Sequence, residues 1–225
     1  KEGTPIETID NKATIQLNDK PEVDSNVVTV VPPTPIEPNI SKDVEGKEEL
    51  MVEHEKEYKY NVKTKISDNV GGYKSLKIAD TLDDRLDIVK TDVLVDGKAS
   101  SLNAKVDGQN VVLELTRKQL DGLVGKEVNL VITSKIKDGT PIEKIPNKAT
   151  IQLNDKPVID SNEVTVIPPT PIQPNITKDV ENAKHIEVDL EKKYNYNVKS
   201  VIPNNVSGYK HLTISDTLDS RLDVV

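Results

Sequence analysis

Asn147-Lys-Ala-Thr-Ile-Gln-Leu-Asn-Asp-Lys156 is an unchanged copy of residues 11–20, and its pattern is that of a β-strand followed by a turn. Ala149, Ile151 and Leu153 alternate with polar residues in this stretch. Successive side chains of a strand point to opposite faces, so a period of two gathers these apolar residues on one face. We therefore expect one face of this strand on a core and the other in solvent.

Short alternating runs of the same kind recur along the chain, at residues 58–66, 75–79, 88–95, 110–115 and 128–136. Turn signals such as Asp107-Gly108 separate several of them. The one plausible helical turn covers residues 116–124, with Thr116 as its N-cap. Seven or more short strands over about 135 residues predict an all-β fold, an Ig-like β-sandwich.

The unchanged copy belongs to a repeat with a period of 136 residues. Residues 40–45 return with one conservative change as 176–181, and residues 72–89 return as 208–225, without insertion or deletion. A period this long corresponds to a whole domain, because solenoid units have periods of roughly 20–50 residues. The sequence therefore predicts β-sandwich domains in tandem.

Two Pro-rich stretches, residues 31–38 and 167–174, fall at the same place in the repeat. Such stretches favour extended, semi-rigid spacers, so we expect them to be linkers between domains. The resulting division is the C-terminal portion of a preceding repeat at 1–37, a complete repeat at 38–173 and the N-terminal portion of a following repeat at 174–225. Because the two end portions together lack the counterpart of residues 90–136, we expect both to be cut from longer copies.

The composition limits the core and the partners. The 225 residues include no Cys, Phe or Trp and one Met, so Val, Ile and Leu must fill the core with six Tyr. The net charge of −8 argues against nucleic acid and anionic membranes, which both attract basic surfaces. No apolar run is long enough to span a bilayer. A cross-link in this chain would have to be something other than a disulfide.

Enzyme and metal signatures are missing from the sequence. His54, His185 and His211 have no metal-ligand spacing, and surface positions suit them best. No phosphate-binding loop, nucleophile elbow or kinase motif is present. The acidic turns at 18–24 and 154–160 could offer oxygen ligands to Ca²⁺, but they lack the spacing of a calcium loop and are better explained as plain turns. We therefore expect no cofactor and no metal.

Three polar residues, Lys42, Asp80 and Asn147, fall at core-facing positions of apolar strands. Lys42 alternates with Ile40 and Val44, while Asp80 and Asn147 alternate with apolar residues of their own strands. A lone buried Lys is costly unless it is paired or neutral. One interpretation is a buried Lys–Asp ion pair with Asn completing the hydrogen bonds. The other is that the register differs and that all three residues are exposed.

The order of Ile-Ser-Lys-Asp-Val (40–44), Ile-Ala-Asp-Thr-Leu (78–82) and Pro-Asn-Lys-Ala-Thr-Ile (146–151) resembles the fimbrial isopeptide-forming domains of Gram-positive surface proteins and pilins. In those domains a Lys on the first strand is joined to an Asn on the last strand, assisted by an acidic residue. The resemblance implies Lys42 as nucleophile, Asn147 as acceptor and Asp80 as the proton-handling acid. In the partial copies it implies Asn11, Lys178 and Asp216 as their equivalents.

These expectations lead to a structural role, with alternatives. The main hypothesis is an extracellular stalk or fibre repeat of a bacterial protein, at the cell surface or in a wall-anchored fibre. Its expected partners are neighbouring repeats of the same protein, and other copies are a further option if it forms a fibre. The alternative is an adhesive module that binds a host or matrix ligand, for which six Tyr without Trp or Phe offer little material. A hydrolase or transferase lacks any site signature. Self-formation of the bond would occur once per domain and would not be turnover.

Overall fold

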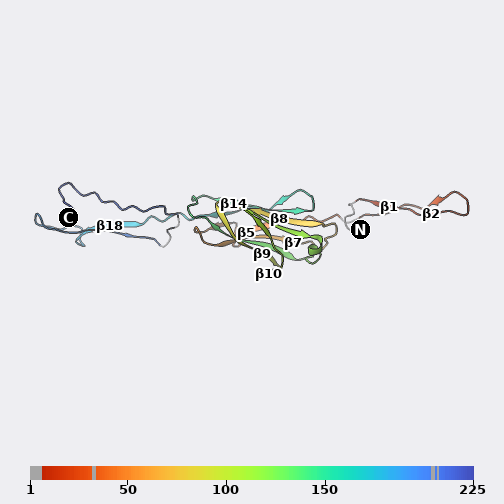
Figure 1. Cartoon of the computed structure of the whole chain (residues 1–225), viewed down its shortest axis with the longest axis horizontal. Coiled ribbons are helices and arrows are strands. Elements are labelled where there is room, and N and C mark those ends of the chain that lie inside the picture. Colours follow the sequence, from red (N-terminus) through yellow and green to blue (C-terminus); the bar gives the residue numbers. More distant parts are fainter. Residues whose placement is uncertain (1–6, 32–33, 204–205, 207) are drawn as a thin grey trace.

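The computed structural model describes residues 7–31, 34–203, 206 and 208–225. Most of its regular structure is β, and a central β-sandwich carries a narrow arm at each end (Figure 1). This confirms the predicted all-β sandwich. Among the described residues, no helix has the length and apolar character needed to cross a membrane.

Two antiparallel sheets of five strands form the sandwich. The first, called here the β13 sheet, has the order β10 (Lys98–Ala99), β9 (Leu86–Val95), β13 (Glu127–Ile136), β7 (Tyr58–Lys65) and β5 (Ser41–Val44). The second, the β8 sheet, has the order β11 (Lys105–Asp107), β12 (Asn110–Thr116), β8 (Ser75–Thr81), β15 (Ala149–Leu153) and β16 (Ile159–Asp160). Their long strands coincide with the alternating runs of the sequence.

The inner faces of the two sheets share one apolar core. In β7 the buried residues are every second one, and β8 and β12 follow the same period. Leu76, Ile78 and Leu113 are almost fully buried. The alternation therefore places Lys42 and Asp80 in this core, because they occupy the inward positions of β5 and β8.

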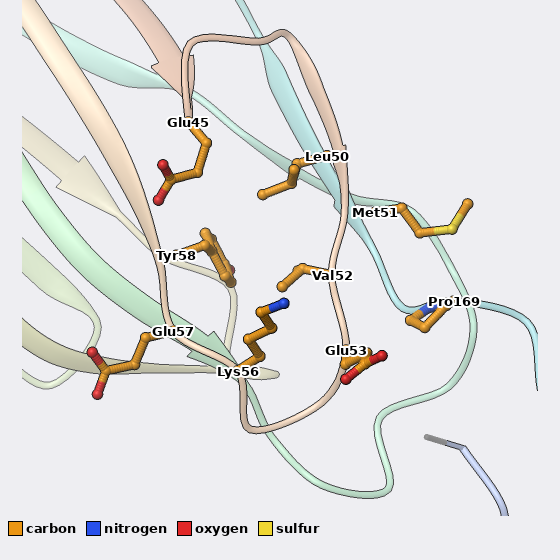
Figure 2. Close-up of a pocket in the computed structure, with 9 residues that line it drawn as sticks. All are labelled: Glu45, Leu50, Met51, Val52, Glu53, Lys56, Glu57, Tyr58 and Pro169. Atoms are coloured by element: carbon orange, nitrogen blue, oxygen red, sulfur yellow. The ribbon is translucent and has the colours of Figure 1, made fainter. Parts of the chain in front are cut away.

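A third, smaller sheet has the order β14 (Ile145–Asn147), β17 (Val164–Ile167) and β6 (Glu49–Met51). β17 runs antiparallel to β14 and parallel to β6, with Ile167 opposite Met51. Figure 2 shows the chain around β6, where Pro169 lies beside Met51 at the rim of a groove of about 410 Å³.

The single helix of the described chain is the short α1 (Arg117–Asp121), at the predicted turn. Thr116 is extended and begins it, and the side-chain oxygen of Gln119 accepts hydrogen bonds from both the backbone N–H and the hydroxyl of Thr116 at 2.8 Å. Leu120 is the residue that α1 buries in the core. Thr116 therefore serves as the predicted N-cap residue, although its hydroxyl donates to Gln119.

The two arms are open pairs of strands. One contains β1 (Ile9–Asn11) paired with β4 (Val28–Val30) and β2 (Thr14–Ile15) paired with β3 (Val23–Asp24), and the other pairs β18 (Asn175–Val180) with β19 (Tyr196–Val201). Ile15 is 72% exposed, whereas Ile151 in the identical sequence of the sandwich is 0% exposed. The difference comes from the second sheet that covers Ile151.

Removing a large side chain from the shared core should cost far more than changing a partly exposed one. We expect Leu113→Ala, at a position that is 1% exposed, to lower the free energy of unfolding by about 2–5 kcal/mol, because it leaves a cavity between the sheets. The control Val106→Thr, on β11 at 48% exposure, keeps a β-branched side chain and should change it by about 0.5 kcal/mol or less. Urea unfolding measures both, and equal losses would contradict this packing.

Candidate functional site

Lys42 and Asp80 form an ion pair that crosses the core. Lys42 projects from β5 of the β13 sheet and Asp80 from β8 of the opposite sheet. The Lys42 Nζ donates a hydrogen bond to the Asp80 Oδ2, and both side chains are 0% exposed. The pair thus links the two sheets, with both side chains shielded from solvent.

Burial moves the pKa values of both partners toward their neutral forms. Desolvation lowers the pKa of Lys42, and the attraction of Asp80 opposes this only in part. Desolvation raises the pKa of Asp80, and this rise is opposed by Lys42 and by the neighbouring Asn147 amide. A low-dielectric site disfavours charge on either group. Burial therefore shifts both pKa values in the direction that disfavours charge, toward a free amine and a protonated carboxyl.

Asn147 completes the group from β14. It is 5% exposed, and two residues further on Ala149 pairs with Asp80 in the β15–β8 register. The Asn147 amide is near enough to Asp80 to lower its pKa. Yet among the described residues neither Asn147 Nδ2 nor Asp80 Oδ1 has a partner with full hydrogen-bond geometry. Buried polar atoms without partners are rare and point to a functional or strained place.

The structure therefore brings together the three residues that sequence alternation assigned to the core. One expectation from the resemblance is wrong: Asn147 is not on the last strand, because β15, β16 and β17 follow β14 in the sandwich. Asn147 instead pairs with Val164 of β17. The alternation could place Asn147 on a face but could not count the strands after it.

An aromatic ring lies against the amine. The Lys42 Nζ lies 4.5 Å from the centroid of the Tyr60 ring, which meets Tyr58 edge-on at 5.3 Å. Burial raises the pKa of the Tyr60 hydroxyl, so this neighbour stays protonated and uncharged. A ring face stabilises a cation modestly and excludes water in either protonation state.

The backbone of Lys42 is held by a residue that sequence reasoning missed. The backbone N–H of Lys42 donates to Asn162 Oδ1 at 2.8 Å, and Asn162 Nδ2 donates to the Lys42 carbonyl at 2.8 Å. Asn162 thereby pairs with β5 as a neighbouring strand would, from the segment just before β17. The same residue occurs 136 positions earlier as Asn26, and this repetition is the signal that could have identified Asn162.

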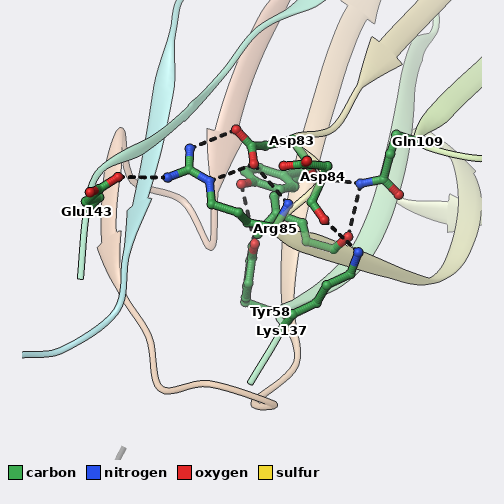
Figure 3. Close-up of polar contacts among 9 residues, drawn as sticks. Tyr58, Asp83, Asp84, Arg85, Gln109, Lys137 and Glu143 are labelled. Carbon is green, nitrogen blue, oxygen red and sulfur yellow. Dashed lines mark hydrogen bonds and ion pairs between the residues drawn. The ribbon is translucent and has the colours of Figure 1, made fainter. Parts of the chain in front are cut away.

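A charged cluster fixes the loop that follows β8 (Figure 3). The Arg85 guanidinium donates two hydrogen bonds to the Asp83 carboxylate, at 2.7 and 2.8 Å, and holds the pKa of that carboxyl well below its usual value. Arg85 also reaches Glu143 at 3.4 Å. Gln109 and Lys137 donate to backbone carbonyls of the same loop. These contacts anchor the end of the strand that carries Asp80.

The partial copies do not assemble the same three residues. Lys178 and Asp216 form an ion pair at 2.7 Å, but their side chains are 40% and 33% exposed. Lys178 also lies 4.4 Å from the Tyr196 ring. Asn11 is exposed on β1, in the arm at the opposite end of the molecule (Figure 1). The enclosed arrangement is thus found in the complete sandwich.

Across residues 7–31, 34–203, 206 and 208–225, no group of three or more His, Cys, Asp or Glu is placed to hold a metal ion. The groove beside β6 is lined by three Glu, one Lys and a few apolar side chains. The lining mixes charged and apolar side chains, and the groove is open. None of Lys42, Asp80 and Asn147 lines it.

Comparison with known proteins places these features in context. No protein-family model matches the chain. The chain is 37% identical over 241 aligned residues to Platelet adherence protein A of Streptococcus gordonii, covering 100% of this chain and 6% of that protein. It resembles the crystal structure of BcpA, the major pilin subunit of Bacillus cereus, with a TM-score of 0.57 and 27% identity over 86% of this chain and 64% of that one.

A fragment of the major pilin GBS80 of Streptococcus agalactiae shares the fold, with a TM-score of 0.50 and 16% identity over 64% of this chain and 58% of that one. The chain thus spans a small part of the curated relative and just under two thirds of BcpA. In sequence and fold it resembles Gram-positive surface adhesins and major pilins, which confirms the predicted resemblance.

The buried ion pair can be probed in an Asn147→Ala background, which keeps the pair but removes its amide neighbour. There, Asp80→Ala should lower the free energy of unfolding by about 3–5 kcal/mol, because it leaves the Lys42 amine buried without its partner. Adding Lys42→Met should restore most of the loss, because the uncompensated group is gone. Urea unfolding of the three variants measures the cycle.

The matched control is the exposed pair Lys90–Asp92, with side chains 58% and 48% exposed. Asp92→Ala should leave the unfolding midpoint nearly unchanged, since exposed pairs contribute little. A Lys42→Met addition that brings no recovery would contradict the importance of the buried charge.

Proposed function

We propose that residues 38–173 form a structural repeat of a surface fibre or adhesin stalk, stiffened by a self-formed amide bond between Lys42 and Asn147. The observation that carries the proposal is the enclosed Lys42–Asp80 pair with the Asn147 amide beside it. The likeness to pilins and a surface adhesin supports an extracellular, wall-anchored location and neighbouring repeats as partners.

The proposed reaction needs no co-reactant. The neutral Lys42 Nζ attacks the side-chain carbonyl carbon of Asn147, while protonated Asp80 hydrogen-bonds the amide and polarises it. A proton leaves the attacking nitrogen and reaches the departing one through Asp80. The carbon–nitrogen bond of the Asn147 amide breaks, ammonia leaves, and a new amide joins Lys42 to the same carbon. Asp80 ends with the proton it began with.

The fold supplies what solution chemistry lacks. Holding amine and amide together replaces a bimolecular encounter, which is worth up to about 7–11 kcal/mol of barrier. The Tyr60 ring and the opposite sheet exclude water from the Lys42 amine. Because these elements come from distant parts of the chain, the reaction would follow folding and take place once in each repeat.

A covalent tie would change the mechanics of the domain. It would close a loop of roughly a hundred residues, which by analogy with disulfides corresponds to about 4–5 kcal/mol of stability. The bond would resist reduction, in keeping with a chain without Cys. For a protein under tension, slower unfolding matters more than equilibrium stability.

Intact-mass measurement tests the bond. The purified chain should weigh one ammonia less than its sequence requires, and peptide mapping should recover a branched product that joins the peptides of Lys42 and Asn147. Lys42→Ala and Asn147→Ala should each restore the full mass by removing one reacting group. Asp80→Asn, which keeps the side-chain shape and removes the acid, should do so as well.

The matched control is Lys178→Ala, since Lys178 lies in the open partial copy. It should keep the mass deficit of one ammonia. A wild-type chain of full sequence mass would refute the bond while leaving the fold intact.

The name of the streptococcal relative describes platelet adherence, and an adhesive role for this repeat is the second candidate. The relative extends far beyond the match, and this chain covers 6% of that protein. Adhesive hot spots favour buried Trp, Tyr and Arg in well-packed pockets. The groove beside β6 has three Glu and one Tyr. The structural role is therefore the stronger proposal.

A further inference from the structure

The Pro-rich segment 167–174 is bound at its first half by the sandwich that precedes it. Ile167 ends β17 and pairs with Met51 of β6. The backbone N–H of Val52 continues this pairing with a hydrogen bond to the Ile167 carbonyl at 3.0 Å. Pro168 and Pro169 are both buried. These residues are thus part of the sandwich and do not form a free spacer.

The second half of the segment contacts the copy that follows it. The Tyr209 hydroxyl donates a hydrogen bond to the Ile172 carbonyl. Residues 171–174 and 208–212 face each other across a hollow of about 340 Å³. A Cβ on Gly208 would come within 3.1 Å of Pro171 and 3.7 Å of Ile142, the latter a residue of the preceding sandwich. Gly208 has a φ of +81°, so it also needs the backbone freedom of glycine.

The same contact occurs one repeat earlier. The Tyr73 hydroxyl donates to the Ile36 carbonyl, and the flanking Pro35 and Pro38 are buried. Tyr73 is 1% exposed, and its carbonyl accepts a hydrogen bond from Arg117 at 3.0 Å. Tyr73 and Tyr209 are thus equivalent residues that bind equivalent carbonyls in two separate segments.

We propose that this segment is a docked junction: the preceding repeat holds its first half, Tyr209 and Gly208 of the following repeat hold its second half, and the two repeats are thereby fixed in orientation. The proposal rests on the tandem organisation proposed above, and its surface takes one partner, the next copy of the same repeat. Thr170, which is exposed, is left between the two docked halves. Composition alone suggested a semi-rigid polyproline spacer. The contacts instead make the segment a shared part of both repeats.

The absence of Cys allows a direct test on the whole chain. Spin labels at Lys98→Cys in the sandwich and Thr177→Cys in the following copy, both exposed sites, report the distance between them by double electron–electron resonance. We expect a single narrow distance distribution. Tyr209→Phe deletes only the hydroxyl, and loss of one such hydrogen bond should raise the undocked population roughly 2- to 13-fold. Gly208→Val should broaden the distribution further by its collision with Pro171.

Tyr196→Phe is the matched control, because Tyr196 lies on β19 and does not line the hollow at residues 171–174. It should leave the distribution unchanged. A broad distribution in the unmodified labelled chain, or one that stays equally narrow in Tyr209→Phe and Gly208→Val, would overturn the docked junction. Intact mass reads the Lys42–Asn147 bond in the same samples, so failure of the junction and failure of the cross-link are seen separately.

Discussion

The enclosed Lys42–Asp80 pair is the constraint on which the rest of the sandwich depends. Removing two charges from water costs several kcal/mol for each ion, and well-packed apolar residues of similar volume are often as stable or more so. Stability is therefore a weak reason for such a pair. Among the residues that the structure describes, Asp80 Oδ1 of the pair and the neighbouring Asn147 Nδ2 are buried without hydrogen-bond partners. The reactivity proposed above explains the combination better than packing does, since an amine, an acid and an amide are the ingredients of amide exchange.

Burial, and with it the proposed reactivity, belongs to the completed sandwich and not to the local sequence. Ile15 and Ile151 occupy identical ten-residue stretches but differ from 72% to 0% in exposure. Lys178 and Asp216 form the same ion pair as their counterparts, yet in the open arm both remain partly exposed. The pKa shifts that disfavour charge on both groups arise from desolvation on burial in the sandwich. The proposed chemistry would thus be coupled to folding, because only the completed sandwich encloses the three residues together.

A period of two in the sequence predicts which residues of a strand face the core. The sequence assigned Lys42, Asp80 and Asn147 to the core because each alternates with apolar residues on its strand, and it identified Thr116 by its position before a helical turn. It could not find Asn162 or the role of Tyr73. Both act on backbone groups distant in sequence, from positions outside regular strands or at their margins, and no local pattern marks such contacts. Repetition at the period of 136 residues was the remaining signal for them.

The position of Asn147 before the last strands alters how the repeat would carry tension. With Lys42 joined to Asn147, force entering at the first linker would pass through the new bond, and the segment between these residues would be bypassed. β15, β16 and β17 would remain in the path of the force. Two contacts of this part of the chain lead back to the buried site, since Ala149 of β15 pairs with Asp80 and Asn162, just before β17, holds the Lys42 backbone.

Force would then leave the sandwich through Ile167, at the end of β17. This strand pairs in parallel with β6. Pulling along paired strands loads their hydrogen bonds together, and not one after another as in peeling. β6 belongs to the bypassed segment, so β17 would be anchored on a part of the domain that is itself protected by the bond. The same strand continues into the segment held by Tyr209. The proposed cross-link and the proposed docked junction would thus lie on one continuous force path, with the non-covalent pairing of β17 and β6 between them.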